Sequence, residues 1–352
     1  MILKKSTHLA GLDIGSRSIK AAEIVKTRSG FNLKRFGTVT IEPNSIEEGS
    51  IKDPEKVAEA IKKLFTENKF RIKNVATSIG GYSVIVKKIN VQNMPESQLH
   101  DTIQFEAEQY IPFDINDVNL DFQILGENEN NPNQMSVLLV AARKDMIEEY
   151  VHLIEMAGLV PTIVDVDAFA LQNVYELNYP PEKQNVALID IGAAKTSLNV
   201  LKGSSSEFIR DISFGCDQIN HQIMNAFNCS YDESEKFKFG KASDNPAAEE
   251  IKEIISSVIS DWSREIRRAF DFYYSSYPED QIQHIVLSGG GGNIRQLHQI
   301  LADETGAEVK TLDPIRSISV EDIPGAGLAA LKKAASQASI CFGLALRRTD
   351  DK

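Results

Sequence analysis

Two stretches of the chain repeat the same pattern of apolar and polar residues. Residues 9–24 (LAGLDIGSRSIKAAEI) hold an apolar run, an Asp-Ile-Gly step at Asp13, a short turn and a second apolar segment. Residues 186–200 (VALIDIGAAKTSLNV) repeat this order around Asp190. Each stretch predicts two buried antiparallel strands joined by a tight turn. The turn preferences of Asp and Gly explain one such hairpin. Two identical units indicate an internal repeat, with one unit at the start of each half of the chain.

The turn of the first hairpin combines small residues with a lysine. Gly15 and Ser16 leave backbone N–H groups exposed at the turn, and such groups can bind a phosphate. Lys20 adds a positive charge nearby, and Asp13 would then face a metal ion on that phosphate. A lysine on a hairpin is equally well explained as a solvated surface residue, so both interpretations of Lys20 stay open.

A third motif joins a predicted strand directly to a predicted helix through four glycines, in the stretch HIVLSGGGGNIRQL at residues 284–297. Glycines allow a sharp turn and leave bare backbone against which a flat ligand can lie. The following helix would point its N-terminus at the phosphates of such a ligand. A flexible glycine turn is the alternative interpretation, and the direct junction of strand and helix argues against it.

The remaining pattern predicts alternating strands and helices. A helix begins after Asp53, a capping residue that is followed by Pro54 at the first helical position. Residues 84–160 follow a compact β-α-β-β-α order and predict a small subdomain inserted into the first half. Further helices are predicted at 247–274 and 325–346. The predicted units are a first domain of residues 1–83 and 161–184, an inserted subdomain of residues 84–160, and a second domain of residues 185–352, in which residues 216–278 form a smaller helical subdomain.

Charge and cysteine content narrow the classes of function. The 352 residues include 38 basic and 50 acidic residues, for a net charge of −12, and Lys and Arg form no run interleaved with aromatic residues. This disfavours direct binding to nucleic acid. Cys216, Cys229 and Cys341 lack metal-ligand spacing, and we expect reduced thiols in a cytosolic protein. No uninterrupted apolar run reaches roughly 18 residues, so the sequence predicts no membrane span.

The three motifs, in this order, resemble those of the actin-like ATPase superfamily, where they form two phosphate loops and an adenosine-binding motif. Within it the chain is most similar to the PilM family of type IV pilus assembly proteins. The resemblance implies an α/β, actin-like (ribonuclease H-like) two-domain ATPase fold with a small α+β subdomain inserted in the first domain. It is carried by the segments LDIGSRSIKAAEI, EAEQYIPF, LIDIGAAKTSLNV and IVLSGGGGNI.

Two other members of the superfamily fit less well. The bacterial actin MreB lacks the insertion expected at residues 84–160. The cell-division protein FtsA typically carries a linker and an amphipathic membrane-targeting tail, whereas this sequence stops at CFGLALRRTDDK. We therefore expect a PilM-type protein.

The resemblance implies that the protein binds ATP and Mg²⁺. Asp13 and Asp190 would flank the cleft and hold the magnesium ion through water, because two facing carboxylates would otherwise repel each other. Lys20 falls where relatives contact the β- and γ-phosphates. The implied ATP-binding residues are Gly15, Ser16, Arg17, Ser18, Lys20, Gly192, Ala193, Ala194, Lys195, Thr196, Gly215, Glu235, Lys238, Gly289, Gly290, Gly291, Gly292 and Asn293.

Two positions depart from the pattern of the relatives. They often carry Asp-Gly in the second loop where this chain has Ala193 and Ala194, which argues against rapid hydrolysis. They also often carry a Gly-Gly pair near the phosphates, whereas here Cys216 follows Gly215.

Three further polar residues have both a functional and a structural interpretation. Glu235 and Lys238 match positions that surround the ribose and adenine in relatives, but their spacing also fits a surface ion pair on a helix. Asp167 lies near the position of a water-orienting residue in hydrolytic relatives and is the implied catalytic residue. It also falls at a predicted helix start, and we favour its role as an N-cap.

For function, the resemblance implies a cytoplasmic scaffold with weak or no ATPase activity, in which Mg-ATP bridges two domains and sets their angle. In the PilM family the partner is the cytoplasmic N-terminal peptide of PilN, an inner-membrane pilus protein. That peptide would lie in a groove between the inserted subdomain and the first domain. Other pilus platform proteins would also bind, self-association is a further expectation, and contact with the membrane would be indirect. The alternatives are a hydrolysing ATPase or kinase of the same fold and a polymerising FtsA-like element.

Overall fold

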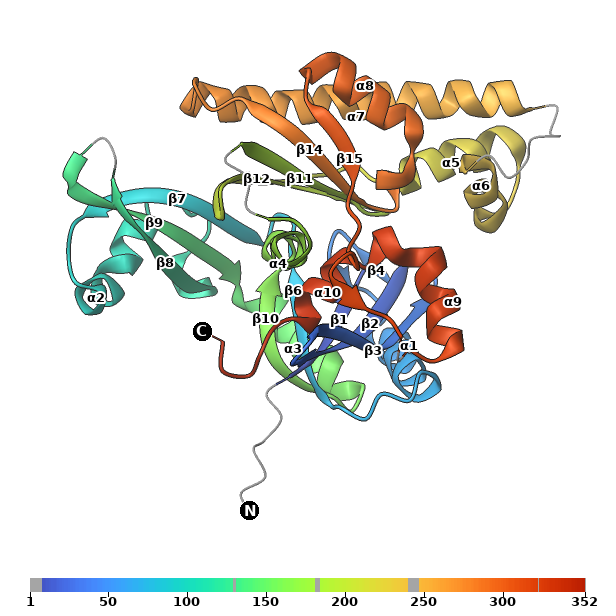
Figure 1. Ribbon diagram of the computed structural model, residues 1–352, viewed down its shortest axis with the longest axis horizontal. Coiled ribbons are helices and arrows are strands. Elements are labelled where there is room, and N and C mark those ends of the chain that lie inside the picture. The colour runs from blue at the N-terminus through green and yellow to red at the C-terminus, as the bar shows by residue number, and fades with distance from the viewer. Residues whose placement is uncertain (1–7, 129–130, 181–183, 240–246, 322, 352) are drawn as a thin grey trace.

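The computed structural model describes residues 8–128, 131–180, 184–239, 247–321 and 323–351, and its centre is formed by two mixed β-sheets (Figure 1). In the first sheet β1 is antiparallel to β2 and parallel to β6, so the first predicted hairpin lies in the middle of the sheet. The strand order of this sheet is β10 (Val160–Val166), β6 (Asn74–Ile79), β1 (Ala10–Ile14), β2 (Ser18–Thr27), β3 (Gly30–Thr40) and β16 (Ile318–Ser319).

The second sheet repeats this arrangement around the second hairpin. Strand β11 is antiparallel to β12 and parallel to β14, as β1 is to β2 and β6. Both hairpins predicted from the repeated pattern are therefore confirmed. The strand order is β13 (Ser205–Ile212), β12 (Thr196–Lys202), β11 (Asn185–Ile191), β14 (Ile282–Gly289) and β15 (Glu308–Thr311).

A third, three-stranded sheet lies beside the two large sheets, at the left of Figure 1. Helix α2 covers one of its faces, and the apolar side chains between them, such as Leu99, Ile103 and Val137, form a separate small core. This core supports an insertion with its own packing. The elements are β7 (Val84–Gln92), α2 (Glu96–Ala107), the 3₁₀ turn η1 (Ile115–Asp117), β8 (Val118–Asn128) and β9 (Asn131–Arg143), with β9 in the middle of the sheet.

Helix α3 (Lys144–Met156) packs differently from our expectation, which placed it inside the inserted block. Its buried Leu153 and Ile154 share a core with Ile61 of helix α1 (Pro54–Glu67), against the first large sheet. Helix α1 itself begins as predicted, because Asp53 accepts a hydrogen bond from the backbone N–H of its third residue at 3.2 Å. The short two-stranded sheet of β4 (Ile46–Glu47) and β5 (Ser50–Ile51) precedes α1 in the chain.

The helices of the second half cover the second sheet. The longest, α7, crosses the whole top of the molecule in Figure 1 and buries Ile259, Trp262 and Ile266 in the core of that sheet. Its predicted start and end are confirmed to within a few residues. These elements are α5 (Cys216–Phe227), α6 (Tyr231–Lys238), α7 (Ala248–Ser276), the 3₁₀ turn η2 (Gly291–Asn293) and α8 (Arg295–Thr305).

The C-terminal segment returns to the first half, although we expected it in the second domain. The predicted helix at 325–346 is broken into α9 (Gly325–Ala334), η3 (Ala335–Ala338) and α10 (Ser339–Ala345). Helix α10 packs against β1 and helix α4 (Asp167–Asn178), so its red ribbon lies among the blue strands of Figure 1. Contact with α4 requires Gly343, where a Cβ would lie 1.7 Å from the Ala170 carbonyl oxygen. Within the described ranges no helix combines the length and apolar character needed to cross a bilayer.

Candidate functional site

One cavity brings the three sequence motifs together. It has a volume of about 1490 Å³, and both hairpin turns and the junction of β14 with η2 contribute to its wall. The predicted site residues that line it are Asp13, Gly15, Ser16, Arg17, Ser18, Lys20, Asp167, Asp190, Gly192, Ala193, Ala194, Lys195, Glu235, Lys238, Gly289, Gly290 and Asn293.

Four predicted ATP-binding residues lie behind this wall instead. Thr196 is fully buried, and its hydroxyl donates to a backbone carbonyl at 3.0 Å. At Gly215 a Cβ would lie 2.3 Å from the Ala193 carbonyl oxygen, so the glycine is needed for close packing against the second turn. Gly291 and Gly292 are buried within η2. These four residues support the loops from behind.

The first hairpin carries a compensated pair of charges. Lys20 Nζ lies 3.0 Å from Asp13 Oδ2, and the two side chains are only 11% and 13% exposed. Burial alone would lower the pKa of Lys20, but the Asp13 carboxylate raises it above its usual value. Lys20 is therefore a buried cation facing the cavity, and its interpretation as a solvated surface lysine is wrong. The turn is closed by Gly15, whose N–H donates to the Ser18 carbonyl at 3.2 Å.

The second hairpin has the same shape and a different charge balance. Burial raises the pKa of Asp190 to about 6, and a hydrogen bond from Ser288 only partly opposes this. The described residues provide no ion pair for Asp190. The turn closes through the Gly192 N–H, which donates to the Lys195 carbonyl at 2.9 Å, and the N–H of Cys216 donates to the Gly192 carbonyl at 3.0 Å. The start of α5 is thus fixed to the second turn.

A complete protein-only metal site is absent from the part of the chain that the structure describes. No group of three or more His, Cys, Asp or Glu side chains there could hold an ion. Asp13 and Asp190 both face the cavity, so an ion near them would take most of its ligands from water or from a bound molecule. Their role as magnesium residues stays a prediction.

Asp167 is an ion-pair residue, and its predicted role as an N-cap is wrong. Helix α4 has Val166 at its N-cap, and Asp167 is its first helical residue. The N-cap makes no side-chain hydrogen bond. Its carboxylate accepts hydrogen bonds from Lys195 Nζ at 2.6 Å and from Ser78 Oγ at 2.5 Å. Burial would raise the pKa of Asp167, but the Lys195 ammonium holds it below its ordinary value. Lys195 of the second loop therefore reaches across to the first half.

Glu235 and Lys238 form the i,i+3 ion pair that their spacing predicted, and both also line the cavity. Glu235 Oε1 accepts a second hydrogen bond, from Asn220 Nδ2 at 2.6 Å. The Lys238 side chain is 2% exposed, unlike a solvated surface lysine. The pair is consequently a fixed part of the wall.

Several lining residues had no signal in the sequence. Tyr231 lies under Arg17, whose guanidinium carbon is 3.7 Å from the centre of the tyrosine ring. Asp211 accepts a hydrogen bond from the Gly81 N–H and lies 3.9 Å from Lys195 Nζ. Both residues lie outside the repeated motifs, so only the folded chain brings them to the cavity.

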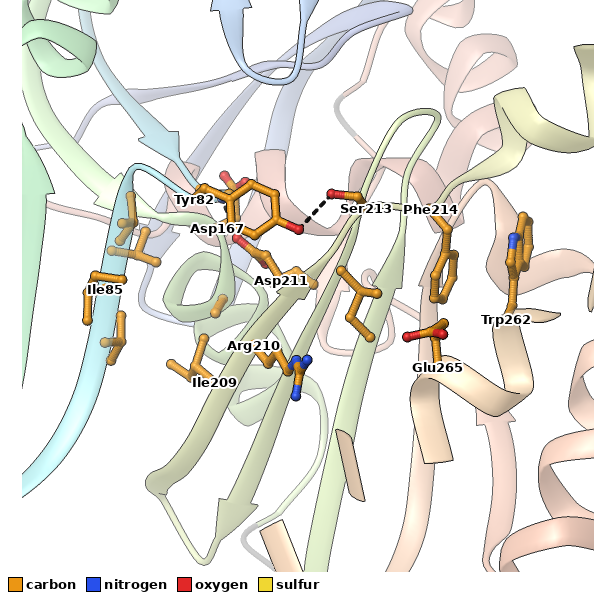
Figure 2. A pocket seen from close by; sticks show the side chains of 18 of the residues that line it. Tyr82, Ile85, Asp167, Ile209, Arg210, Asp211, Ser213, Phe214, Trp262 and Glu265 are labelled. Carbon is orange, nitrogen blue, oxygen red and sulfur yellow. Dashed lines mark hydrogen bonds between the residues drawn. The ribbon is translucent and has the colours of Figure 1, made fainter. Parts of the chain in front are cut away.

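A second cavity of about 580 Å³ adjoins the first (Figure 2). It opens between β7, an edge strand of the inserted sheet, and β13, an edge strand of the second large sheet. Ile85 and Ile209 face it as half-buried side chains, with Trp262 of α7 beyond them. Tyr82 stands between the two cavities and shares a 2.9 Å hydrogen bond with Ser213.

Comparison with known proteins gives both a family and a fold. The family described as type IV pilus assembly protein PilM matches residues 11–349. Among solved structures, the chain is 27% identical to one in a PilM-PilN type IV pilus biogenesis complex, with a TM-score of 0.83 over 98% of this chain and 99% of that chain. The predicted actin-like fold is confirmed.

Two further relatives are more distant. The cell division protein FtsA of Bacillus subtilis is 22% identical over 342 residues, which cover 89% of this chain and 71% of that protein. The structure of MreB5 of Spiroplasma citri bound to ADP is 13% identical, with a TM-score of 0.52 over 96% of this chain and 94% of that one. The match over nearly the whole chain settles the family: the chain belongs to the PilM family of type IV pilus assembly proteins.

Proposed function

We propose that the protein is an ATP-binding scaffold of the type IV pilus assembly platform, whose body is held in one conformation by nucleotide bound between its halves. The observation that carries this proposal is the shared cavity, onto which both Asp hairpins open from opposite halves. The complex with ADP of the distantly similar MreB5 is in keeping with it.

The residues of the cavity suit a nucleotide with a divalent cation. Lys20 and Lys195 are cations near the two turns, and the carboxylate of Asp190 has no ion-pair partner among the described residues. Arg17 Nε is buried without a hydrogen-bond acceptor in the described part of the chain. ATP would supply phosphate oxygens for the basic groups, and Mg²⁺ near Asp13 and Asp190 would compensate negative charge. Glu235 and Lys238 would lie near the ribose and adenine.

The site favours binding over rapid hydrolysis. Hydrolysis needs a group that orients or activates water, and Asp167 is the candidate on the cavity wall. Its two oxygens already accept hydrogen bonds from Lys195 and Ser78. With Ala193 and Ala194 in the second turn, we expect weak turnover or none.

For the partner, we place the cytoplasmic N-terminal peptide of PilN in the second cavity. The similarity to a chain of a PilM-PilN complex supports PilN as the partner. Strands β7 and β13, which are edge strands of their sheets among the described residues, border this cavity. An extended peptide can add to such an edge while its apolar side chains enter the gap. This site adjoins the inserted subdomain on the side of the second large sheet, whereas we expected the groove between that subdomain and the first domain. The protein would then be held at the cytoplasmic side of the inner membrane through PilN.

The nucleotide proposal is tested by gel filtration after incubation with ATP and Mg²⁺. We expect intact ATP to travel with the protein at about one per chain, and Lys20→Ala or Asp190→Ala to weaken binding at least tenfold, about 1.4 kcal/mol. Unchanged affinity in both variants would refute the assignment of the loops. Bound ADP with free phosphate in solution would instead identify a hydrolysing ATPase.

The peptide proposal is tested by titrating a labelled PilN N-terminal peptide in a polarisation assay. We expect Ile85→Asp to weaken binding about tenfold or more, because it places a charge in the apolar gap. The matched control is Ile124→Asp, at an exposed position of β8, the opposite edge of the same sheet. Equal loss in both variants, or in neither, would remove the peptide from this cavity.

A further inference from the structure

A contact between an arginine and a tyrosine spans the large cavity. Arg17 belongs to the turn of the first hairpin, and Tyr231 is the first residue of α6 in the second half. The guanidinium carbon of Arg17 lies 3.7 Å from the centre of the tyrosine ring, which is close stacking of a cation on an aromatic face. Both residues line the cavity, so their contact closes part of its circumference.

The tyrosine ring is held in place by the second turn. Tyr231 donates a hydrogen bond from its hydroxyl to Asp217 Oδ1 at 2.6 Å, and the N–H of Asp217 donates to the Ala193 carbonyl at 2.9 Å. Burial, reinforced by the hydrogen bond to Asp217, raises the pKa of Tyr231, so the hydroxyl keeps its proton. A continuous chain of contacts therefore runs from the first phosphate loop through Tyr231 and Asp217 to the second.

The backbone of Arg17 is fixed, whereas one donor of its guanidinium, Nε, has no acceptor among the described residues. The Ile41 N–H donates to the Arg17 carbonyl at 3.1 Å, which anchors the turn to the start of the loop after β3. Arg17 Nε is buried and has no acceptor in the described part of the chain. A guanidinium carries five donors in a rigid plane, so it can stack on a ring and still donate to an anion beside it.

We propose that Arg17 and Tyr231 form a clamp across the nucleotide cavity, which slows release of the bound nucleotide. The inference rests on the proposed binding of ATP and adds to it the residues that control its escape. Opening the two halves breaks the stacking and exposes the ring, so a closed cavity is favoured. With a phosphate accepting a hydrogen bond from the Arg17 guanidinium, the bound nucleotide becomes part of the closure.

The test is the release rate of radiolabelled ATP. Protein loaded with labelled ATP and Mg²⁺ is mixed with excess unlabelled ATP, and the label retained on a filter is followed with time. We expect Arg17→Ala and Tyr231→Leu each to release ATP about tenfold faster. The double variant should release it no faster than Arg17→Ala, because that change already removes the stacking. Tyr231→Phe keeps the ring, and we expect it to stay within about threefold of the unmodified protein. Arg28→Ala, in the exposed turn between β2 and β3, is the matched control and should leave the rate unchanged.

Each result has one meaning. Failure of the unmodified protein to retain ATP would refute the proposed nucleotide function itself. Retention at an unchanged rate in Arg17→Ala and Tyr231→Leu would refute the clamp and leave nucleotide binding intact. Faster release in Arg17→Ala alone would also refute it, because Arg17 would then act on the phosphates without the ring. Thermal melting of each variant without nucleotide identifies any that is unfolded, and Arg17→Lys, which keeps the charge and loses the planar stacking, replaces Arg17→Ala in that case.

Discussion

The two Asp hairpins start from the same sequence pattern and differ in how their charge is compensated. In the first hairpin, Lys20 neutralises Asp13 from the opposite strand. In the second, residue Ser197 lies opposite Asp190, and the only lysine of the turn, Lys195, pairs with Asp167 of the other half. The repeat therefore preserves the backbone. The first hairpin compensates its own buried aspartate, whereas the second has a carboxylate that a bound cation would stabilise.

The largest expected effect is an opposite change in stability at the two hairpins. Lys20→Met leaves a buried carboxylate unpaired and should lower the free energy of unfolding by about 3 kcal/mol. Asp190→Asn removes an uncompensated buried charge and should raise it by about 2 kcal/mol at pH 8. Since the folded-state pKa of Asp190, about 6, lies above the ordinary 3.8, its cost develops as the pH rises between these values and is complete at pH 8.

Urea denaturation without nucleotide or divalent cations measures both changes. The double variant Asp13→Asn/Lys20→Met should regain most of the stability lost in Lys20→Met, because neither position of the pair then carries a buried charge. If Lys20→Met and Asp190→Asn change the stability in the same direction, the contrast between the hairpins is wrong.

The second effect concerns removal of the metal. We expect chelation of Mg²⁺ to weaken ATP binding by the unmodified protein about tenfold, about 1.4 kcal/mol. In Asp190→Asn, chelation of Mg²⁺ should weaken ATP binding less than about threefold. In Asp13→Asn, chelation should weaken ATP binding more than in Asp190→Asn, because Lys20 already neutralises Asp13 in the unmodified protein. Calorimetric titration with and without a chelator provides the affinities, and an equal response in both variants would show that the ion does not distinguish the hairpins.

A smaller effect is expected from the ion pair that joins the halves. Lys195→Gln should lower the free energy of unfolding by about 1 kcal/mol, since its side chain is 38% exposed and water screens the pair. Asp167→Asn tests the same contact from the other side, and the two losses should not add in the double variant. Fully additive losses, measured by urea denaturation, would mean that the two residues act separately.

The smallest effect uses one cysteine near each hairpin as a probe. Burial raises the pKa of Cys216 to about 11, and it raises that of Cys341 well above its ordinary value, so both should react slowly with maleimide at pH 7.5. Cys216 lines the cavity, whereas Cys341 packs against the Gly11 carbonyl behind the first hairpin. We expect ATP to slow labelling of Cys216 about threefold further and to leave Cys341 unchanged, as followed by peptide mass spectrometry. Protection of Cys341 alone would place the nucleotide elsewhere.

The parts of the fold predicted correctly from the sequence are those set by neighbouring residues. The cap at Asp53, the two hairpins and the long helix α7 follow from local pattern and turn chemistry. That Asp13 and Asp190 would line one cavity was implied by the resemblance to the actin-like superfamily. The three cysteines are free thiols, and Cys216 and Cys341 are buried as predicted.

The wrong predictions concern contacts between segments that lie far apart in the sequence. The apolar face of α3 predicted a helix, but its spacing is the same whether it packs on the inserted sheet or on α1. Asp167 was assigned to a cap because Asp favours helix starts, whereas the lysine it pairs with lies 28 positions away in the sequence. Tyr231 was missed for the same reason, since its contact with Arg17 forms only when the two halves fold against each other.

The return of the C-terminal segment has a consequence for synthesis of the protein in the cell. Strand β16 pairs with β3 through Ile318 and Phe31, and α10 fills the space behind β1. The earliest strands to leave the ribosome therefore wait for residues 318–345 before their sheet is completed. Contacts of such long sequence separation slow folding and leave strand edges and apolar surface exposed meanwhile. Newly made chains should accordingly depend on chaperones until translation has passed α10, even though the inserted sheet can form its own small core much earlier.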